Sequence, residues 1–220
     1  MNRLLMTALG VAALAGSATL AAEETKPLQL EFPPPKVTST PAPIKLPNLE
    51  PPRTPQPEVL VPAGVTNLAA GKTVTSSDPY PIIGDLTLVT DGEKESEDGF
   101  YVELGEDLQW VQIDLEQASE LFGIAVWHYH AQARAYLDVV VQVSDDPEFK
   151  TGVTTLFNND HDNSSKLGRG SDPAYVETNR GRLIPAKGTV ARYVRLYSHG
   201  NSSDGLNHYI EVEIFGRPKS

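Results

Sequence analysis

"WVQIDL", residues 110–115, alternates apolar and polar side chains and decides the fold class. Val111, Ile113 and Leu115 fall on one face of an extended chain, while the polar Gln112 falls on the other. A period of two is that of a β-strand with one buried face. The stretch therefore predicts a strand that packs its apolar face against a core.

Four further segments show the same alternation, and they are residues 121–130, 136–144, 191–198 and 209–216. The side chains expected to face the core are Phe122, Ile124, Val126, Leu137, Val139, Val141, Val143, Val194, Leu196, Ile210, Val212 and Ile214. The intervening loops are rich in Asp, Asn, Ser and Gly, and no long stretch has helical periodicity. One-sided strands joined by polar loops predict an all-β domain, an antiparallel β-sandwich with two sheets packed face to face.

Composition divides the chain into three parts. Residues 1–22 contain a basic residue, an apolar run and then small residues, which is the layout of a secretory signal peptide. Residues 23–64 hold 12 of the 18 prolines, and proline removes backbone donors and fixes φ. We therefore expect a disordered, semi-extended linker there, serving as a stalk or as a solvated tail. Residues 65–218 are expected to form one globular domain.

Charge and cysteine content restrict the setting and the partners. The formal net charge of −11 argues against nucleic acid or an anionic membrane surface as a partner. The chain has no cysteine, so it forms no disulfide, and export without disulfides favours a bacterial envelope protein. We expect a periplasmic, cell-surface or extracellular location, with no membrane insertion after signal cleavage.

Six segments, in this order along the chain, resemble the discoidin domain, also called the coagulation factor 5/8 C-terminal domain. These segments are NLAAGKTVTSS (67–77), LVTDGE (88–93), WVQIDL (110–115), VQVSDD (141–146), ARYVRLY (191–197) and EVEIFG (211–216). The family belongs with the galactose-binding-like jelly rolls and is similar to family 32 carbohydrate-binding modules. The resemblance covers nearly all of residues 65–217 and implies a jelly-roll sandwich whose function is binding.

The resemblance also implies a structural calcium ion that ties the Asp-Gly loop to the last strand. By position, Asp91 supplies a carboxylate, Glu93 a main-chain carbonyl and Glu211 a second carboxylate, with Ser96 or Asp98 as a further oxygen donor. Calcium takes six to eight oxygen ligands, including backbone carbonyls, so this set is chemically suitable. Two features depart from the family. The disulfide that joins the first and last strands of many animal members is missing, and the loops are polar where phospholipid-binding members have apolar tips, which argues against membrane binding.

"VWHYHAQAR", residues 126–134, is the candidate ligand-binding segment. His128 and His130 share one strand face with the core residues before them, so we expect the strand to leave the sandwich there, with both imidazoles at its rim. In relatives this strand leads to the ligand-binding end, where His, Asn and Arg contact sugar hydroxyls and a ring packs on the sugar. Arg134 completes the polar set, and Trp127, Tyr129 or Tyr80 can supply the ring.

A second polar loop, residues 157–165, is expected to line the same rim. It offers Asn158, Asp160 and His161 as further ligand-binding residues.

Two other interpretations of the histidine pair remain open. Two histidines at i and i+2 can bind zinc when a third ligand joins them, here His161, Asp160 or Asp162, and such a site can activate water for hydrolysis. Alternatively, His128 and His130 are hydrogen-bonded packing residues at a strand end.

The sequence therefore predicts an exported, non-catalytic binding module. Its expected partner is a saccharide or a glycan-bearing surface, and its expected cofactor is structural calcium. The alternatives are a protein–protein adhesion or scaffold module of the cell envelope, and a small metal-dependent hydrolase that uses His128 and His130.

Overall fold

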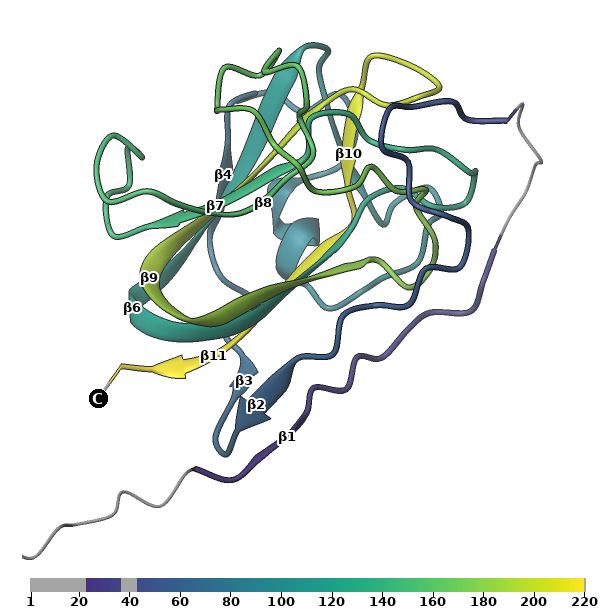
Figure 1. The fold of residues 1–220 in the computed structure, drawn as a ribbon. Coiled ribbons are helices and arrows are strands. Elements are labelled where there is room, and N and C mark those ends of the chain that lie inside the picture. Colours follow the sequence, from purple (N-terminus) through teal and green to yellow (C-terminus); the bar gives the residue numbers. More distant parts are fainter. Residues whose placement is uncertain (1–22, 37–42, 220) are drawn as a thin grey trace, which may run out of the picture.

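The structure, a computed structural model, describes residues 23–36 and 43–219 (Figure 1). The predicted signal peptide lies outside these residues. The strands are β1 (Thr25–Pro27), β2 (Leu60–Pro62), β3 (Thr66–Asn67), β4 (Val74–Ser76), β5 (Val102–Leu104), β6 (Leu108–Trp127), β7 (Val140–Ser144), β8 (Thr154–Asn158), β9 (Arg182–His199), β10 (Asn207–Tyr209) and β11 (Glu211–Pro218). One short 3-10 helix, η1 (Leu86–Thr90), is the only helix among the described residues. The predicted all-β class is confirmed.

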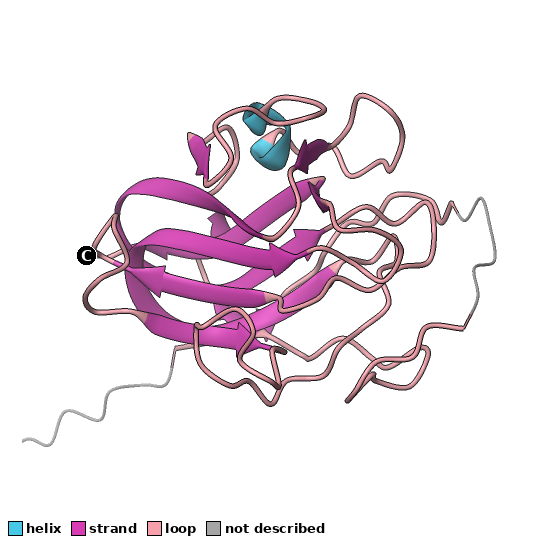
Figure 2. Ribbon diagram, turned by 90° about the horizontal axis from the view of Figure 1, so that it is seen from above, coloured by secondary structure: helices cyan, strands magenta, loops and turns pink. Residues whose placement is uncertain are grey.

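Two long strands, β6 and β9, bend and run through both layers of the sandwich (Figures 1 and 2). In one layer, the first half of β6 pairs with β4 on one side and with the second half of β9 on the other. The second half of β9 also pairs with β7, and β7 pairs with β8. In the other layer, the second half of β6 pairs with β11 and with the first half of β9. β11 also pairs with β3. All of these pairings are antiparallel, and the register of β6 against β9 shifts between Asp114 and Ser119, where the layers change.

The main core lies between these two layers. Val111, Ile113 and Leu115 from the first half of β6 are buried together with Ile124 and Val126 from its second half. The same cluster receives side chains from the other strands, as the alternation predicts, and these include Val139, Val141, Val143, Val194, Leu196, Val212 and Ile214.

Phe122 departs from its predicted place in this core. The register of β6 shifts between Leu121 and Gly123, and a bulge of this kind transfers the following side chains to the opposite face. As a result Leu121 enters the main core, whereas Phe122 packs against a second cluster on the outer side of the sheet. Ile210, which lies between β10 and β11, also joins the second cluster, and Leu137 lies outside both.

The second cluster is covered by the proline-rich segment, which differs from the expected disordered linker. We call residues 23–36 and 43–64 the strap. In the strap, β1 pairs with β2, and Val59 and Val61 are buried against Trp127, with Leu28 packed beside them. Figure 1 shows the strap running along the outside of the sandwich as a further layer.

Proline remains compatible with this arrangement because an edge or extended segment needs few backbone donors. Burial of these apolar side chains contributes favourable free energy that holds the strap on the sandwich, whereas a fully solvated linker has no such contribution. The strap starts beside the end of the last strand, since Glu23 accepts two hydrogen bonds from the guanidinium of Arg217. Within the described residues, no helix has the length and apolarity needed to span a bilayer.

Candidate functional site

The candidate site is the end of the sandwich where β6 stops at Trp127 and the chain turns into residues 128–139. Trp127, His128 and His130 are almost fully buried there, with exposed fractions of 0%, 1% and 3%. The expected open rim at the two imidazoles is therefore not present, because other segments cover this strand end.

His128 is held by a buried carboxylate from a distant part of the chain. Its Nδ1 donates to Oε1 of Glu177 at 2.6 Å, and both side chains are at most 1% exposed. Its ring stacks on Tyr136 with centroids 4.3 Å apart and lies 4.9 Å from the ring of Tyr209. These contacts match the packing interpretation of His128.

His208, a third buried histidine, extends this polar network. Nε2 of His208 lies 2.9 Å from Oε2 of Glu103, and its Nδ1 lies 2.9 Å from the hydroxyl of Tyr136. A neutral imidazole that donates to Glu103 and accepts from Tyr136 satisfies both contacts. Burial, aided by the nearby guanidinium of Arg134, lowers the pKa of His208 to about 4, so this neutral form persists at neutral pH.

His130 and Trp127 are fixed by loops on the other side of the strand end. Nε2 of His130 donates to the carbonyl of Lys94 at 3.0 Å, and the amide of His130 donates to the hydroxyl of Ser96. Nε1 of Trp127 donates to the carbonyl of Asn179 at 3.0 Å, and the ammonium of Lys94 lies over its ring. The hydroxyl of Ser96, offered with Asp98 as a further calcium ligand, accepts from two amides of the histidine segment, and its role toward calcium remains a prediction.

Arg134, 6% exposed, and the half-buried Tyr129 lie directly beneath the surface of this end. The guanidinium of Arg134 lies over the ring of Tyr129, 4.7 Å from its centroid. It donates to Oε1 of Gln132 at 3.1 Å and lies 3.4 Å from Oδ2 of Asp204. Gln132 is exposed and the side chain of Asp204 is 39% exposed, so both offer hydrogen-bonding groups to a ligand. We call Gln132, Arg134 and Asp204 the polar rim.

The predicted residues of the 157–165 loop mainly stabilise the loop itself. Nδ2 of Asn158 donates to the carbonyl of Gly168 at 2.9 Å. The carboxylate of Asp160, 0% exposed, accepts from the amide of Asn163 at 2.7 Å, and further donors come from the two serines that follow. Nδ1 of His161 is buried without a partner. A ligand role for these residues remains a prediction.

The histidine pair does not assemble a metal site in the described part of the chain. The one group of three or more potential ligands whose donor atoms lie within 4.8 Å of one another is Asp138, Asp160 and Asp162. Neither His128 nor His130 belongs to it, so the geometry required for the hydrolase alternative is not formed.

The Asp-Gly loop does meet the last strand as the calcium prediction requires. The amide of Gly92 donates to Oε2 of Glu211 at 3.1 Å, while the other oxygen of this buried carboxyl has no partner. Burial, reinforced by Glu213 and Asp91, raises the pKa of Glu211 to about 9. Asp91 and Glu93 are exposed in the loop. An oxygen-rich set with an unpartnered buried carboxyl oxygen fits a calcium ion.

An apolar loop tip, which the sequence analysis described as polar, lies at the same end. Tyr80, Ile82 and Ile83 are 85%, 57% and 40% exposed. The loop is rigidly anchored, because the amide of Ile82 donates to the carbonyl of Glu103 at 2.7 Å and the carboxylate of Asp78 accepts from Gly105 at 2.9 Å. The run "DPYPIIGD" (78–85) contains the signal that could have revealed it.

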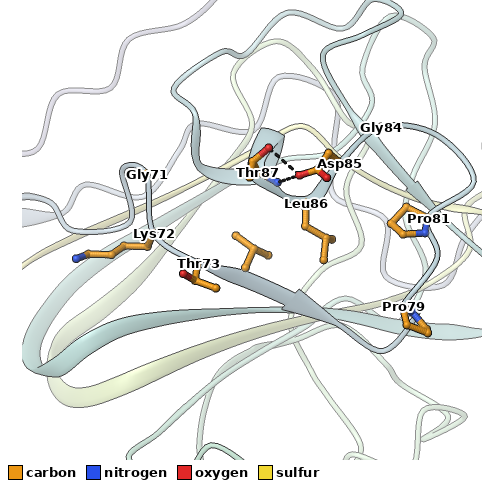
Figure 3. Close-up of a pocket in the computed structure, with 10 residues that line it drawn as sticks. Gly71, Lys72, Thr73, Pro79, Pro81, Gly84, Asp85, Leu86 and Thr87 are labelled. Atoms are coloured by element: carbon orange, nitrogen blue, oxygen red, sulfur yellow. Dashed lines mark hydrogen bonds between the residues drawn. The ribbon is translucent and has the colours of Figure 1, made fainter.

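Beside this loop, a cleft of about 420 Å³ opens between β4 and η1 (Figure 3). Its walls combine apolar and hydroxyl-bearing side chains, and they are Gly71, Lys72, Thr73, Val74, Pro79, Pro81, Gly84, Asp85, Leu86 and Thr87. None of the predicted ligand-binding residues lines it.

No protein-family model matches the sequence, and no curated protein matches it either. Among solved structures, the chain is similar to a family 89 glycoside hydrolase from Clostridium perfringens in complex with GlcNAc-alpha-1,4-galactose. The identity is 20%, the TM-score is 0.53, and the match covers 70% of this chain but 15% of the enzyme. The similarity therefore concerns one module of a larger enzyme.

Two smaller proteins are matched over almost their whole length. Chitosan-binding module 1 of a chitosanase/glucanase from Paenibacillus sp. IK-5 is 21% identical, with a TM-score of 0.49 and coverage of 69% of this chain and 99% of that one. The family 32 carbohydrate-binding module of AlyQ, in complex with 4,5-unsaturated mannuronic acid, is 19% identical, with a TM-score of 0.46 and coverage of 65% and 93%. At these identities the similarity concerns the fold alone, and the match to the module of the family 89 enzyme agrees with the predicted antiparallel β-sandwich jelly roll.

Proposed function

We propose that the chain is an exported, non-catalytic module that binds saccharides through the polar rim and the exposed ring of Tyr80. The observation that carries the proposal is the arrangement of Arg134, whose guanidinium is held between the exposed groups of Gln132 and Asp204 above a buried network. Planar side chains that are already held in place can form hydrogen bonds to a pair of sugar hydroxyls, and they lose little conformational entropy when the sugar binds.

The ring for the apolar face of a sugar is better supplied by Tyr80 than by the rings named with the histidines. Trp127 is buried and Arg134 covers Tyr129, whereas Tyr80 is 85% exposed on an anchored loop. The loop reaches the same end of the module, because it pairs with β5 and β5 pairs with β10 beside His208. An aromatic ring presented in this way provides a large contact area.

Replacing Gln132 or Tyr80 by alanine is expected to weaken saccharide binding about tenfold or more, since each change removes a direct contact. A glycan array followed by titration calorimetry with the best-bound oligosaccharide measures the effect. Gln117→Ala is the matched control, because Gln117 is equally exposed but lies in the bend of β6, at Asp114–Ser119. If both variants bind as this control does, the proposed surface is wrong. A wild-type protein that binds no saccharide would contradict the function itself and leave a protein partner as the remaining candidate.

We also propose that calcium binds where Glu211 meets the Asp-Gly loop. Added calcium chloride is expected to raise the melting temperature of the wild-type protein, because binding to the folded state alone stabilises it. Glu211→Gln should abolish the increase. Glu93→Gln should keep it, since only the main-chain carbonyl of Glu93 is expected to coordinate. An unchanged melting temperature across calcium and chelator, measured by differential scanning fluorimetry, would contradict the site.

The pH dependence of this site follows from the pKa of Glu211, which is raised to about 9. Below that pH the carboxyl holds a proton that calcium must displace, so calcium affinity should rise between pH 6 and 8 with about one proton released per ion. Without calcium, the contribution of Glu211 to stability should be fully present below the ordinary Glu pKa of 4.5 and be lost as pH rises toward 9, because the unfolded state loses this proton first. Calorimetry in buffers of different ionisation enthalpy measures the released proton.

A further inference from the structure

The strap forms hydrogen bonds with both ends of one irregular segment of the module, residues 172–182. At the start of that segment, Glu50 and Ala174 are linked by a backbone hydrogen bond of 2.8 Å, and Ala174 donates in turn to the carbonyl of Asn48 at 3.1 Å. Near its end, the side chain of Gln56 donates to the carbonyl of Gly181 at 2.6 Å and accepts from the amide of Leu183 at 3.0 Å.

An ion pair and a further hydrogen bond reinforce these contacts. The carboxylate of Glu50 accepts two hydrogen bonds from Nη1 of Arg182, at 3.0 and 2.9 Å. The two side chains are 16% and 14% exposed, so this pair is screened less than an ordinary surface pair. From the first part of the strap, the carbonyl of Pro33 accepts from Nδ2 of Asn179 at 2.7 Å.

Between these anchor points the same segment holds the candidate site. The amide of Glu177 donates to the carbonyl of Arg134 at 2.8 Å, and its carboxylate accepts from His128 at 2.6 Å. The carbonyl of Asn179 accepts from the indole of Trp127. Residues 172–182 therefore touch the strap on one side and the 127–134 turn on the other.

We propose that the strap is a clamp that orders residues 172–182 and, through Glu177, fixes the backbone of Arg134. Only a single bridge residue of the segment before Arg182 belongs to a β-pairing. Its other backbone hydrogen bonds are few, and they include those from the amide of Asp172 to Asn158 and from the amide of Gly181 to Thr178, so the strap supplies a large share of the contacts that order it. The proline-rich stretch thus preorganises the polar rim without touching a ligand. The consequence for saccharide affinity rests on the proposed function, whereas the clamp itself does not.

Hydrogen exchange of the Glu177 amide, followed by NMR, tests the clamp without any ligand. Gln56→Ala removes two strap contacts and is expected to accelerate exchange at Glu177 roughly tenfold, while amides of β7 keep their wild-type rates. Glu58→Ala is the control, because Glu58 is exposed on the same stretch of the strap. Glu50→Gln, which weakens the ion pair to Arg182, is the second variant and should act in the same direction.

An unchanged Glu177 amide in both variants would overturn the proposal, since the strap would then be docked without ordering the segment. Uniform acceleration of all amides would also overturn it, because the strap would then contribute only to global stability. If the polar rim binds saccharide, Gln56→Ala should also weaken that affinity several-fold. If the wild-type protein binds no saccharide, the exchange result still decides the clamp.

Discussion

His128→Ala is expected to lower the free energy of unfolding by about 3–5 kcal/mol. The substitution removes the imidazole and leaves the carboxylate of Glu177, 0% exposed at its side chain, without its buried partner. It also removes the ring that stacks on Tyr136 and leaves a cavity. Urea denaturation measures the effect, with an unchanged slope indicating the same surface exposed on unfolding.

His199→Ala is the matched control for this substitution. His199 makes the same kind of contact, with Nδ1 lying 3.0 Å from the carboxylate of Asp138, but its side chain is 35% exposed. Its loss should cost at most about 1 kcal/mol, because solvent replaces the missing partner. The double variant His128→Ala/Glu177→Ala should be less destabilised than the sum of the single changes. Equal effects of the two histidine substitutions would show that the buried pair contributes nothing beyond an exposed one.

Gly181→Ala is expected to destabilise the protein by about 3 kcal/mol or more, for two independent reasons. The residue has a φ of +59°, which a side chain adopts only with strain. In addition, a Cβ atom would lie 2.7 Å from the ring of Trp127 and 2.6 Å from the carbonyl oxygen of Val126. The carbonyl of Gly181 also accepts from Gln56, so any backbone shift that relieves the clash pulls on the strap.

Gly152→Ala separates these two causes. Gly152 has a φ of +60°, and a Cβ atom there would meet nothing within 4 Å. It should therefore cost about 1 kcal/mol, the backbone strain alone. Thermal and denaturant unfolding of both variants provide the comparison. A Gly181→Ala protein as stable as Gly152→Ala would mean that the Trp127 ring can move away, and that the strap does not hold it in place.

The sandwich could be predicted because its information is local. Alternation in residues 110–115 and in the later strands specifies which side chains enter the core, and the structure buries Val111, Ile113 and Leu115 accordingly. The exception, Phe122, lies at a register shift, and a bulge leaves no mark in the alternation before the strands pair.

The candidate site was less predictable because its determining contacts are distant in sequence. His128 is buried by Glu177, 49 residues away, and period-two reasoning about one strand cannot show that partner. The docking of the strap was not predicted for a different reason. Its high proline content indicated a disordered linker, and this outweighed the short pairs of apolar residues within it. Leu28 and Leu30, like Val59 and Val61, are two residues apart and cover one face, and the unbroken run from Ile124 to Trp127 already favoured burial on both sides.

The contact between Glu23 and Arg217 has a topological consequence. Because the beginning of the strap lies against the last strand, a short flexible joint can connect the two without crossing the sandwich. New termini could then be opened among the exposed residues 162–164. The resulting circular permutant would keep every strand pairing while placing both chain ends in the loop beside Asp160.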